Sequence, residues 1–344
     1  MGHMKKYSCP HCQTTTSVIR KTKRGKSIRY FCKACTKYFS ISPHFFNTIA
    51  LLNDHLDGLS FRKLAAKYNI SKSHAWDICN EQLQRLPDNN QFTHKYCSRF
   101  SSTLVVDGKY FKVKGKKYGY CLLWGVDYFR HDIPISIVAP SENYHNWARY
   151  FSYYRIISDH PELLVCDDNV NIKMAARARF PAVTIQTCTN HFKENIRRTL
   201  KTRSDDTYKP FMRSIEAILA HKRTDADMFK QLQNLWDTHQ HDPVCLSVLA
   251  NIQKYYHELT GYRGIPGSPT TTNIIESLNS HLQARLKPLR SFENVRHAKL
   301  WLNGYVLRRR YTKWTDCKGK FRNLNGKRGV DMTKKHGIVL PTYF

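Results

Sequence analysis

Three acidic residues lie in surroundings where a carboxylate is costly. Asp107 lies inside the mostly apolar run of residues 103–113, and Asp167 ends the run Glu-Leu-Leu-Val-Cys-Asp. Glu276 lies in Thr-Thr-Asn-Ile-Ile-Glu-Ser-Leu-Asn. A bound cation is a common compensator of a carboxylate in apolar surroundings. Two acids on strands and one on a helix would suit a pair of hard divalent cations over a phosphate.

The two strand-borne acids need a sheet that holds them side by side. The residue pattern predicts strands over 103–113, 118–127, 133–139, 163–166 and 183–187, with helices over 142–157 and 171–180. Three antiparallel strands followed by alternating helix and parallel strand are the order of a ribonuclease H-like α/β fold. That fold places two acids on adjacent central strands. Asp167 would then lie at the carboxyl end of its strand, where α/β sheets usually bind ligands.

The third acid is predicted to lie on a helix that starts at Thr271-Thr272-Asn273. Its apolar stripe consists of Ile275, Leu278, Leu282 and Leu286. Glu276 lies at the edge of this stripe, so Glu276 and Asn279 can both reach the acid edge of the sheet. Asn273 and Glu276 also match a capping box, in which Glu276 would only satisfy backbone donors, and the residue pattern alone does not decide. Before this helix, apolar spacing over residues 205–260 predicts a packed helical insertion.

The charge of the chain indicates a polyanionic partner. Its 344 residues include 56 Lys plus Arg against 26 Asp plus Glu, a formal net charge of +30. Nucleic acid is the usual partner of such a chain. No apolar run approaches the length of about 18 residues that a membrane span requires, and no signal peptide is visible. Eleven Cys without a signal peptide favour a reducing compartment, and metal ligands over disulfides.

Four cysteines near the N-terminus have the spacing of a metal site. Cys9 and Cys12, and then Cys32 and Cys35, form two CxxC pairs separated by 19 residues that contain a predicted β-hairpin. This layout predicts a zinc ribbon in which structural Zn²⁺ supplies much of the folding free energy. The module contains no acid and is expected to clamp DNA, with docking to a protein as the alternative. The basic residues expected to contact DNA here are Lys23, Arg24 and Lys26.

Two short predicted helices follow the zinc ribbon. Ser60 and Ser71 are their expected N-caps, and Asn69-Ile70-Ser71 is the turn between them. This is the helix-turn-helix pattern, and an ordinary helical hairpin is the alternative. Residues early in the second helix would face a DNA groove, namely Lys72, Ser73 and His74.

The C-terminal part of the chain is basic and aromatic. Arg308, Arg309 and Arg310 lie on a predicted helix, and Trp314 and Phe321 are interleaved with Lys and Arg beyond it. Such a mixture suits phosphate contacts plus stacking on exposed bases, so these residues are expected to contact DNA. A disordered solvated tail is the alternative.

Several motifs together resemble the Mutator-like superfamily of DDE transposases, and its bacterial insertion-sequence branch most. The motifs are Val-Val-Asp107-Gly, Val-Cys-Asp167 with Ala175 and Phe180-Pro181 downstream, Cys188-Thr-Asn-His191, and Thr-Thr-Asn273-Ile-Ile-Glu276-Ser-Leu-Asn279. The resemblance covers residues 100–310 and implies that Asp107, Asp167 and Glu276 are the catalytic acids. Asp168 competes with Asp167 for the second position, and the spacing to Ala175 and Phe180-Pro181 favours Asp167.

Cys188 and His191 have the spacing of two ligands of one metal, but no second pair lies nearby in the sequence. We therefore expect them to shape the acid site or the DNA path and not to bind zinc. Asn279 is expected to support the site with them.

The resemblance implies an enzyme that binds transposon terminal inverted repeats and catalyses metal-dependent DNA strand cleavage and strand transfer. Asp107, Asp167 and Glu276 would hold two Mg²⁺ ions, with Mn²⁺ as a substitute. The expected partners are double-stranded DNA, as transposon ends and as target, and a second copy of the chain. We expect a homodimer, at least on DNA, in the bacterial cytoplasm at the nucleoid. A non-transposing nuclease of the same fold and a DNA-binding regulator are the alternatives.

These expectations divide the chain into six segments. They are a zinc ribbon (5–45), a helix-turn-helix DNA-binding domain (46–98), the first part of a ribonuclease H-like catalytic domain (99–204), an all-helical insertion (205–268), the second part of the catalytic domain with the Glu276 helix (269–312), and a basic C-terminal tail (313–344).

Overall fold

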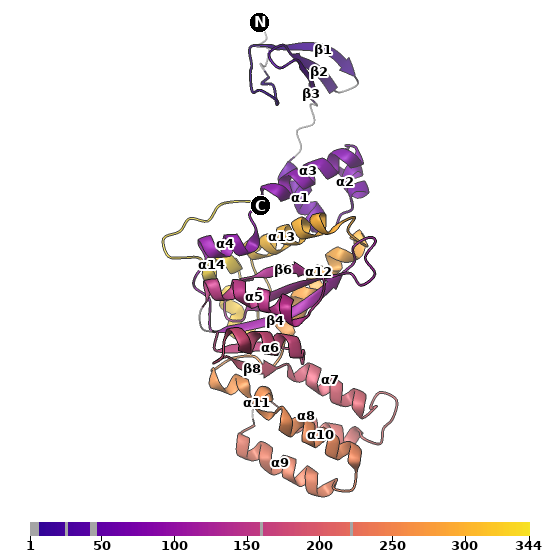
Figure 1. The fold of residues 1–344 in the computed structure, drawn as a ribbon, viewed down its shortest axis with the longest axis vertical. Coiled ribbons are helices and arrows are strands. Elements are labelled where there is room, and N and C mark those ends of the chain that lie inside the picture. The colour runs from indigo at the N-terminus through magenta and orange to yellow at the C-terminus, as the bar shows by residue number, and fades with distance from the viewer. Residues whose placement is uncertain (1–6, 25–26, 42–46, 159–160, 221–222) are drawn as a thin grey trace. The chain divides into compact units, whose positions relative to one another are not determined.

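The computed structural model describes residues 7–24, 27–41, 47–158, 161–220 and 223–344. The chain forms two compact units, residues 1–51 and residues 52–344. The smaller unit contains one sheet, and the larger unit contains a second sheet and most of the helices (Figure 1). The finer division of residues 52–344 into domains stays a prediction.

The smaller unit contains one antiparallel sheet. Its strands are β1 (Val18–Arg24), β2 (Ser27–Cys32) and β3 (Lys37–Ile41), with β2 in the middle. β1 and β2 form the predicted hairpin, in which Val18 pairs with Cys32. The sequence analysis did not predict β3, which pairs with β2 and stacks Phe39 on Tyr30 with ring centroids 5.6 Å apart.

The larger unit is built on a mixed sheet. Its strands are β4 (Thr103–Phe111), β5 (Tyr120–Asp127), β6 (Ser136–Ala139), β7 (Leu163–Cys166) and β8 (Thr184–Thr187). The order across the sheet is β6-β5-β4-β7-β8. β4, β5 and β6 are antiparallel to their neighbours in this series, whereas β7 runs parallel to β4 and β8 runs parallel to β7. The predicted strands are therefore present with their ends shifted by a few residues, and the predicted α/β class is confirmed.

Both faces of β4 are covered, because successive side chains of a strand point to opposite faces. Leu104 and Val106 pack in one core with α5 (Tyr144–Ile157) and α6 (Val170–Arg179). Val105 packs in the other core with α12 (Asn273–Leu289) and α13 (Val295–Tyr311). The predicted stripe of α12 lies in this second core.

The chain between β8 and α12 is helical, as predicted. It contains α7 (Thr189–Thr199), α8 (Lys209–Ile218), α9 (Asp225–Thr238), α10 (Pro243–Lys254), α11 (Tyr256–Leu259) and the 3₁₀ turn η1 (Gly261–Gly264). These helices have an apolar core of their own, to which α7 contributes Phe192 and Ile196. Figure 1 shows them extending beyond the edge of the sheet at β8.

Four helices span residues 48–96 and include the two short helices that the sequence predicts. They are α1 (Thr48–Leu56), α2 (Phe61–Tyr68), α3 (Lys72–Arg85) and α4 (Asn89–Tyr96). The Ser71 hydroxyl caps α3 by accepting the His74 N–H at 3.0 Å. Trp76 of α3 packs against His297 of α13, with ring centroids 4.4 Å apart. The helix pair is therefore packed onto the body of the larger unit.

The C-terminal residues also pack onto the larger unit, so the alternative of a disordered tail does not hold for them. They include the 3₁₀ helix η2 (Gly319–Leu324) and α14 (Gly329–Thr333). Phe321 packs edge-on against Tyr128 at 5.1 Å, and Tyr343 packs against Tyr311 at 5.8 Å. Among the described helices of the chain, none is both long enough and apolar enough to cross a membrane.

Candidate active site

Asp107 and Asp167 are brought together by neighbouring parallel strands. β4 pairs with β7 so that Val105 lies opposite Val165. Each acid follows its valine by two residues, so the alternation of the strand directs both side chains to the face that α12 covers. The register places both acids at the same height, at the carboxyl end of β7. This end of a sheet is where α/β proteins usually bind ligands.

Asp168 points into a different environment. Its Oδ1 lies 2.5 Å from Nζ of Lys173, which also lies 2.6 Å from a carboxylate oxygen of Glu258 on α11. Arg177 completes the group with a 2.6 Å contact to Glu258. Asp168, Lys173, Arg177 and Glu258 are called the ion network below. The charge of Asp168 is thus neutralised, whereas no ion pair within 4.0 Å involves Asp167 among the described residues.

Asn279 links helix α12 to Asp107 by a hydrogen bond. Its Nδ2 donates to Oδ2 of Asp107 at 2.6 Å, and its Oδ1 accepts a hydrogen bond from Nε1 of Trp124 at 3.0 Å. Trp124 lies opposite Asp107 in the β4–β5 pairing. The amide therefore holds the carboxylate from one side, and the predicted proximity of Asn279 to the acids is a feature of the structure.

Glu276 lies one turn before Asn279 on the same helix. Its carboxylate accepts a hydrogen bond from the Thr272 hydroxyl at 2.6 Å and lies 3.9 Å from Nδ1 of His191. In a capping box the glutamate would instead accept a backbone N–H. That contact is not formed among the described residues, and the Asn273 side chain bonds to Asn190 at 3.1 Å.

Cys188 and His191 stand next to Glu276. A sulfur atom of Cys188, a ring nitrogen of His191 and a carboxylate oxygen of Glu276 all lie within 4.8 Å of one another. Cys188 accepts hydrogen bonds from Thr272, from the hydroxyl at 3.1 Å and from the backbone at 3.3 Å. The hydrogen bond between the two side chains raises the pKa of His191 to about 9, so this imidazole carries a positive charge close to the acids at neutral pH.

A further acid in this region, Glu142, carries no signal in the sequence. It lies just before α5, and Nδ2 of Asn169 donates to its Oε2 at 3.4 Å. The backbone N–H of the same Asn169 donates to Oδ1 of Asp167 at 3.2 Å. Asp107, Asp167 and Glu142 are called the acid cluster below. Glu142 follows Pro140 and Ser141 in a loop-like sequence, and only the fold brings it to the other two acids.

Burial dominates the electrostatics of the acid cluster. Together with the charge of Asp167, burial raises the pKa of Asp107 to about 7. Burial also raises the pKa of Asp167, and burial with the charge of Asp167 raises the pKa of Glu142. Each upward shift of a pKa means that the surroundings disfavour the ionised form of that carboxyl group. A cation bound between these groups would reverse that effect.

The four cysteines of the smaller unit converge. The Sγ atoms of Cys9 and Cys35 lie 3.6 Å apart, as do those of Cys12 and Cys32, and the four sulfur atoms all lie within 4.8 Å of one another. Tetrahedral zinc with Zn–S bonds of about 2.3 Å requires sulfur atoms roughly 3.8 Å apart. The donor set and its spacing therefore fit Zn²⁺.

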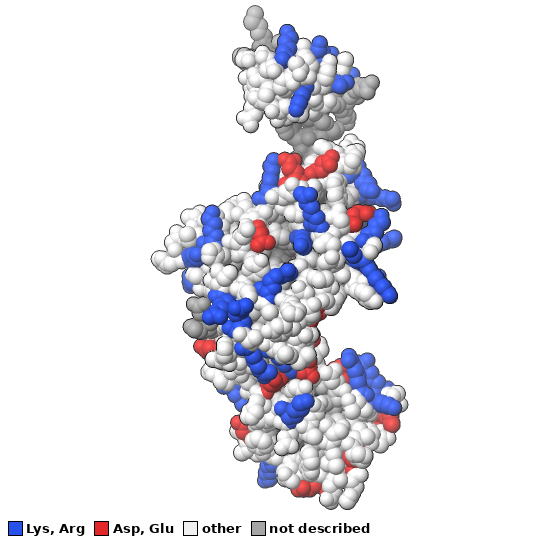
Figure 2. Space-filling model, viewed as in Figure 1, with Lys and Arg blue, Asp and Glu red and all other residues white. Residues whose placement is uncertain are grey.

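The residues of β1 and α3 that are predicted to contact DNA differ in how far the structure describes them. Lys72, Ser73 and His74 are exposed at the start of α3, and Lys23 is exposed on β1. Lys26 and the side chain of Arg24 lie outside the described residues. Lys and Arg form several separate patches on the visible face of residues 52–344, and acidic side chains form smaller groups there (Figure 2).

The prediction of DNA contact is wrong for one of the three arginines of α13, and the other two also have partners within the larger unit. Arg310 is buried, and its guanidinium binds both carboxylate oxygens of Asp132 at 2.8 and 2.7 Å. Arg308 pairs with Asp57 at 2.7 Å, and the Arg309 guanidinium lies 3.9 Å from the ring centroid of Trp314. Trp314 and Phe321, expected to stack on bases, are likewise used in packing within the larger unit. Consecutive residues of a helix point about 100° apart, which explains why three adjacent arginines cannot share one DNA-facing surface.

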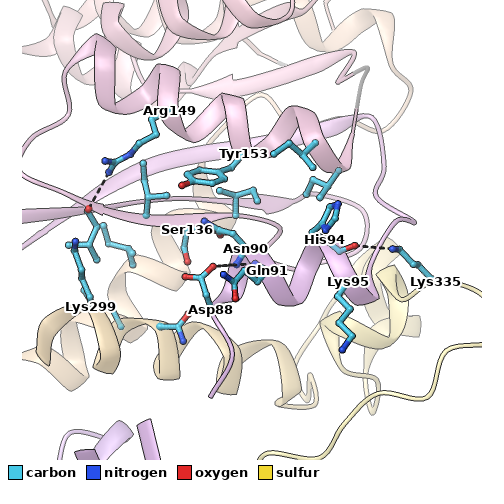
Figure 3. Close-up of a pocket in the computed structure, with 18 residues that line it drawn as sticks. Asp88, Asn90, Gln91, His94, Lys95, Ser136, Arg149, Tyr153, Lys299 and Lys335 are labelled. Carbon is cyan, nitrogen blue, oxygen red and sulfur yellow. Dashed lines mark hydrogen bonds between the residues drawn. The ribbon is translucent and has the colours of Figure 1, made fainter. Parts of the chain in front are cut away.

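A pocket of about 1060 Å³ lies elsewhere, between α4, α5, α13 and the edge strand β6. Arg149 and Tyr153 enter it from α5, and Lys299 enters it from α13 (Figure 3). None of the acid cluster lines this pocket. A smaller cavity of about 470 Å³ lies beside Glu276 and Asn279 and is also lined by Lys109 and Lys287.

Relatives of the chain are mobile-element proteins. Transposases for insertion sequence element IS256 in transposon Tn4001, from Staphylococcus aureus and Enterococcus faecalis, are each 24% identical to it over 194 residues. The match covers 55% of this chain and 48% of each relative. The chain thus spans about half the length of the curated relatives it matches.

Similar solved structures include the HTLV-2 integrase catalytic core domain in complex with magnesium, at 16% identity and a TM-score of 0.22, over 40% of this chain and 86% of that chain. Another is the Mos1 transposase paired-end complex with left transposon end, at 14% identity and a TM-score of 0.16, over 67% of this chain and 82% of that chain. Scores of this size do not establish a common fold.

The family comparison covers most of the chain. The family model described as "Transposase, Mutator family" matches residues 34–317. This range includes both strands of the Asp107–Asp167 pair and the helix of Glu276. The chain therefore belongs to the Mutator family of transposases.

Proposed function

We propose that the chain is a DDE transposase that binds transposon terminal inverted repeats and catalyses metal-dependent DNA strand cleavage and strand transfer. The observation that carries this proposal is the Asp107–Asp167 pair, in register on adjacent strands and without an ion pair among the described residues. The chain has 56 Lys and Arg, enough to neutralise these acids. Asp168, one residue further on, does receive a lysine.

The sheet supports a ribonuclease H-like assignment for the catalytic part. An antiparallel meander of three strands is followed by two parallel strands, and the first strand of the meander is central. α5 and α6 cover one face, and α12 returns to the other face after the helical insertion. In this arrangement acids from two strands and one helix can approach one place from different parts of the chain.

The proposed metal is Mg²⁺, with Mn²⁺ as a substitute, because the donors are carboxylate oxygens. Two such ions would supply positive charge for both the attacking and the leaving oxygen in an in-line displacement at phosphorus. Asp107, Asp167 and Glu276 would hold them. Asn279 fixes the orientation of Asp107, and Thr272 holds Glu276 through a 2.6 Å hydrogen bond.

His191 and Cys188 act as support in this proposal. The imidazole lies beside Glu276 and carries a positive charge at neutral pH, because its hydrogen bond with Cys188 raises its pKa to about 9. A positive charge there lowers the repulsion between the carboxylates before any divalent ion arrives. It also offers a hydrogen-bond donor at the mouth of the site, where a phosphate would lie.

DNA binding is proposed for the smaller unit and for α3. The four cysteines would hold structural Zn²⁺ and thereby form a zinc ribbon, and Lys23, Arg24 and Lys26 would meet phosphates. Lys72, Ser73 and His74 are exposed at the start of α3, the part of a helix-turn-helix that usually contacts bases. A homodimer would pair two transposon ends, which chromatography of the DNA complex would detect as two copies per complex.

The test is a cleavage and strand-transfer assay on DNA with the ends that flank this gene, in Mg²⁺ or Mn²⁺. Wild type is compared with Glu276→Gln. We expect metal-dependent cutting and joining in the wild type and loss of both in the variant, with DNA binding retained. Cutting without joining would favour the nuclease alternative. Tight binding without cutting would favour the regulator and overturn the proposal.

A further inference from the structure

Another cavity of the larger unit lies where the start of α3 meets the junction of α12 and α13, and its volume is about 500 Å³. Sites for small ligands commonly measure about 300–1,000 Å³. Trp76 lines the cavity from α3, Leu289 lines it from the end of α12, and His297 lines it from α13. Along α12, Leu289 lies about 20 Å from Glu276. The cavity is therefore separate from the candidate active site.

Aromatic rings form much of the wall of this cavity. Trp76 packs against His297 with ring centroids 4.4 Å apart, and edge-on against Phe61 at 5.1 Å. Phe292 lies 5.8 Å from His297. Phe61 and Trp76 are half-buried and line the cavity, so part of each ring remains accessible. Such rings offer a flat aromatic guest a surface on which to stack.

Two buried imidazoles in the wall each have a nitrogen without a partner. Nε2 of His55 and Nε2 of His297 form no hydrogen bond within the described part of the chain, and the two residues are 1% and 6% exposed. Nδ1 of His55 lies 3.0 Å from the carbonyl oxygen of Leu59, so Nδ1 carries the proton and Nε2 is an acceptor. Burial lowers the pKa of both imidazoles to about 4, so both are neutral at pH 7.

Packing alone does not account for these imidazoles. A buried acceptor without a donor costs free energy, whereas a phenylalanine of similar shape would fill the same place without that cost. His55 already lies in an aromatic environment, with its ring centroid 4.3 Å from that of Phe61. A guest that stacks on the rings and donates a hydrogen bond would satisfy both features of the wall.

The mouth of the cavity lies beside the residues of α3 that are proposed to meet DNA. Lys72 and Ser73 line the cavity and are exposed, as is Ser291 between α12 and α13. Glu293 is the one acid among the described residues that line it, and Lys114 balances its charge at 3.2 Å. A DNA phosphate bound by Lys72 would therefore bring a nucleotide next to the opening.

We propose that this cavity binds one DNA base that has left the duplex, stacking it on Trp76 and accepting a hydrogen bond from it at Nε2 of His55. The inference rests on the proposed function, because it needs DNA bound at the start of α3. A base with an exocyclic amino group suits the acceptor best, which means adenine, cytosine or guanine. Opening a base pair costs free energy, and stacking on aromatic side chains returns part of it. The cavity thus responds to how easily one base pair opens, whereas Lys72 responds only to phosphate.

The test uses the zinc-loaded full chain and duplexes of the end DNA that flanks this gene. Each base pair is replaced in turn by a mismatch, and the affinity is measured by fluorescence anisotropy without Mg²⁺. A mismatch lowers the cost of opening the pair. At the captured position we therefore expect the wild type to bind the mismatched duplex about tenfold more tightly than the matched duplex.

Four variants assign this gain in affinity. His55→Asn keeps a donor for Leu59 but removes the Nε2 acceptor, and Trp76→Leu removes the stacking ring. Each should reduce the gain to about threefold or less. Lys72→Gln should weaken binding to every duplex and keep the gain, because it removes a phosphate contact only. His241→Asn, at an exposed position before α10, should match the wild type.

The outcomes separate this inference from the proposed function. A wild type that cuts and joins end DNA in Mg²⁺ but gains affinity at no mismatch would overturn the base-binding cavity and leave the proposed function standing. An equal gain in the wild type, His55→Asn and Trp76→Leu would also overturn it, since the gain would then come from easier bending of the duplex. A wild type that neither binds nor cuts end DNA would overturn both ideas. Circular dichroism checks that each variant is folded, and His55→Asn carries the test if Trp76→Leu does not fold.

Discussion

The acid cluster and the ion network contain adjacent residues of one chain and yet differ in how their charge is balanced. Asp167 shares the cluster with Asp107 and Glu142, and no cation pairs with it among the described residues. Asp168 is bound by Lys173 at 2.5 Å, and Lys173 also binds Glu258 at 2.6 Å. The side chain of Lys173 is only 5% exposed, whereas that of Asp168 is 29% exposed, so water reaches this pair mainly from the side of the aspartate.

The difference follows from the period of a strand. Asp167 continues the alternation of Leu163 and Val165 and so faces α12, whereas Asp168 falls on the side of α6. The network joins α6 to α11 and thereby links the helices between β8 and α12 to the layer that covers the sheet. In this protein, neutralised acids hold parts of the fold together, and unneutralised acids mark the place where a cation is expected.

The sharpest test of this difference replaces each aspartate in turn. We expect Asp167→Asn to lower the cleavage rate by about 1000-fold or more, since a lost metal ligand removes on the order of 4 kcal/mol of transition-state stabilisation. Asp168→Asn should keep the cleavage rate within about tenfold, which corresponds to roughly 1.4 kcal/mol. Single-turnover cleavage of end DNA at saturating Mg²⁺ measures both. Equal losses in the two variants would contradict the separation of the sites.

The second test removes Lys173, the buried cation of the ion network. Lys173→Met removes a buried cation and leaves the partly buried Asp168 and Glu258 without their shared partner, which should cost about 3 kcal/mol of unfolding free energy. Urea denaturation followed by tryptophan fluorescence measures this. The control is Lys209→Met, which breaks an exposed pair with Asp206 and should cost less than about 0.5 kcal/mol. A loss no larger than the control would show that the network does not stabilise the fold.

The pH dependence of stability should have opposite signs in the two regions. The pKa of Asp107 rises from its ordinary value of 3.8 to about 7 on folding, so the folded state binds more protons between those values. Stability from this group therefore falls as pH rises from about 4 to 7. The pairing with Lys173 lowers the pKa of Glu258 in spite of its burial, so its stabilisation is lost as pH falls below about 4.5.

Urea denaturation between pH 3 and pH 8, about the range of these pKa values, measures this contrast without added divalent metal. We expect Asp107→Asn to remove part of the fall above pH 4, and Glu258→Gln to remove part of the loss at the acid end. The same slope in wild type and Asp107→Asn would show that Asp107 is not protonated more readily in the folded state.

The smallest expected effect separates the members of the network. Arg177 also binds Glu258 at 2.6 Å, but its side chain is 50% exposed. Water competes for such a pair, so Arg177→Ala should cost less than about 1 kcal/mol of unfolding free energy. A loss as large as that of Lys173→Met would mean that the exposed cation matters as much as the buried one.

Much of the candidate site could be predicted from local patterns. The alternating strands, the serine before α3, the stripe of α12 and the paired cysteines all appear in the structure where the sequence placed them. The choice of Asp167 over Asp168 as the second acid stays a prediction, and the structure adds that only Asp167 shares a strand face with Asp107, because each follows a buried valine by two residues. The prediction for Arg310 was wrong because charge alone was taken to mean exposure, whereas Arg310 is buried and paired with Asp132.

The sequence by itself determined which segments form strands and helices and where the cysteine pairs lie, because these features depend on residues a few positions apart. Tertiary structure alone decided which distant side chains share a place. Glu142 lies against Gly108 of β4, Lys173 binds Glu258 across 84 intervening residues, and Asn279 of α12 binds Asp107 of β4. Such contacts are set by how helices and sheet pack to bury their apolar faces, and no local pattern records that packing.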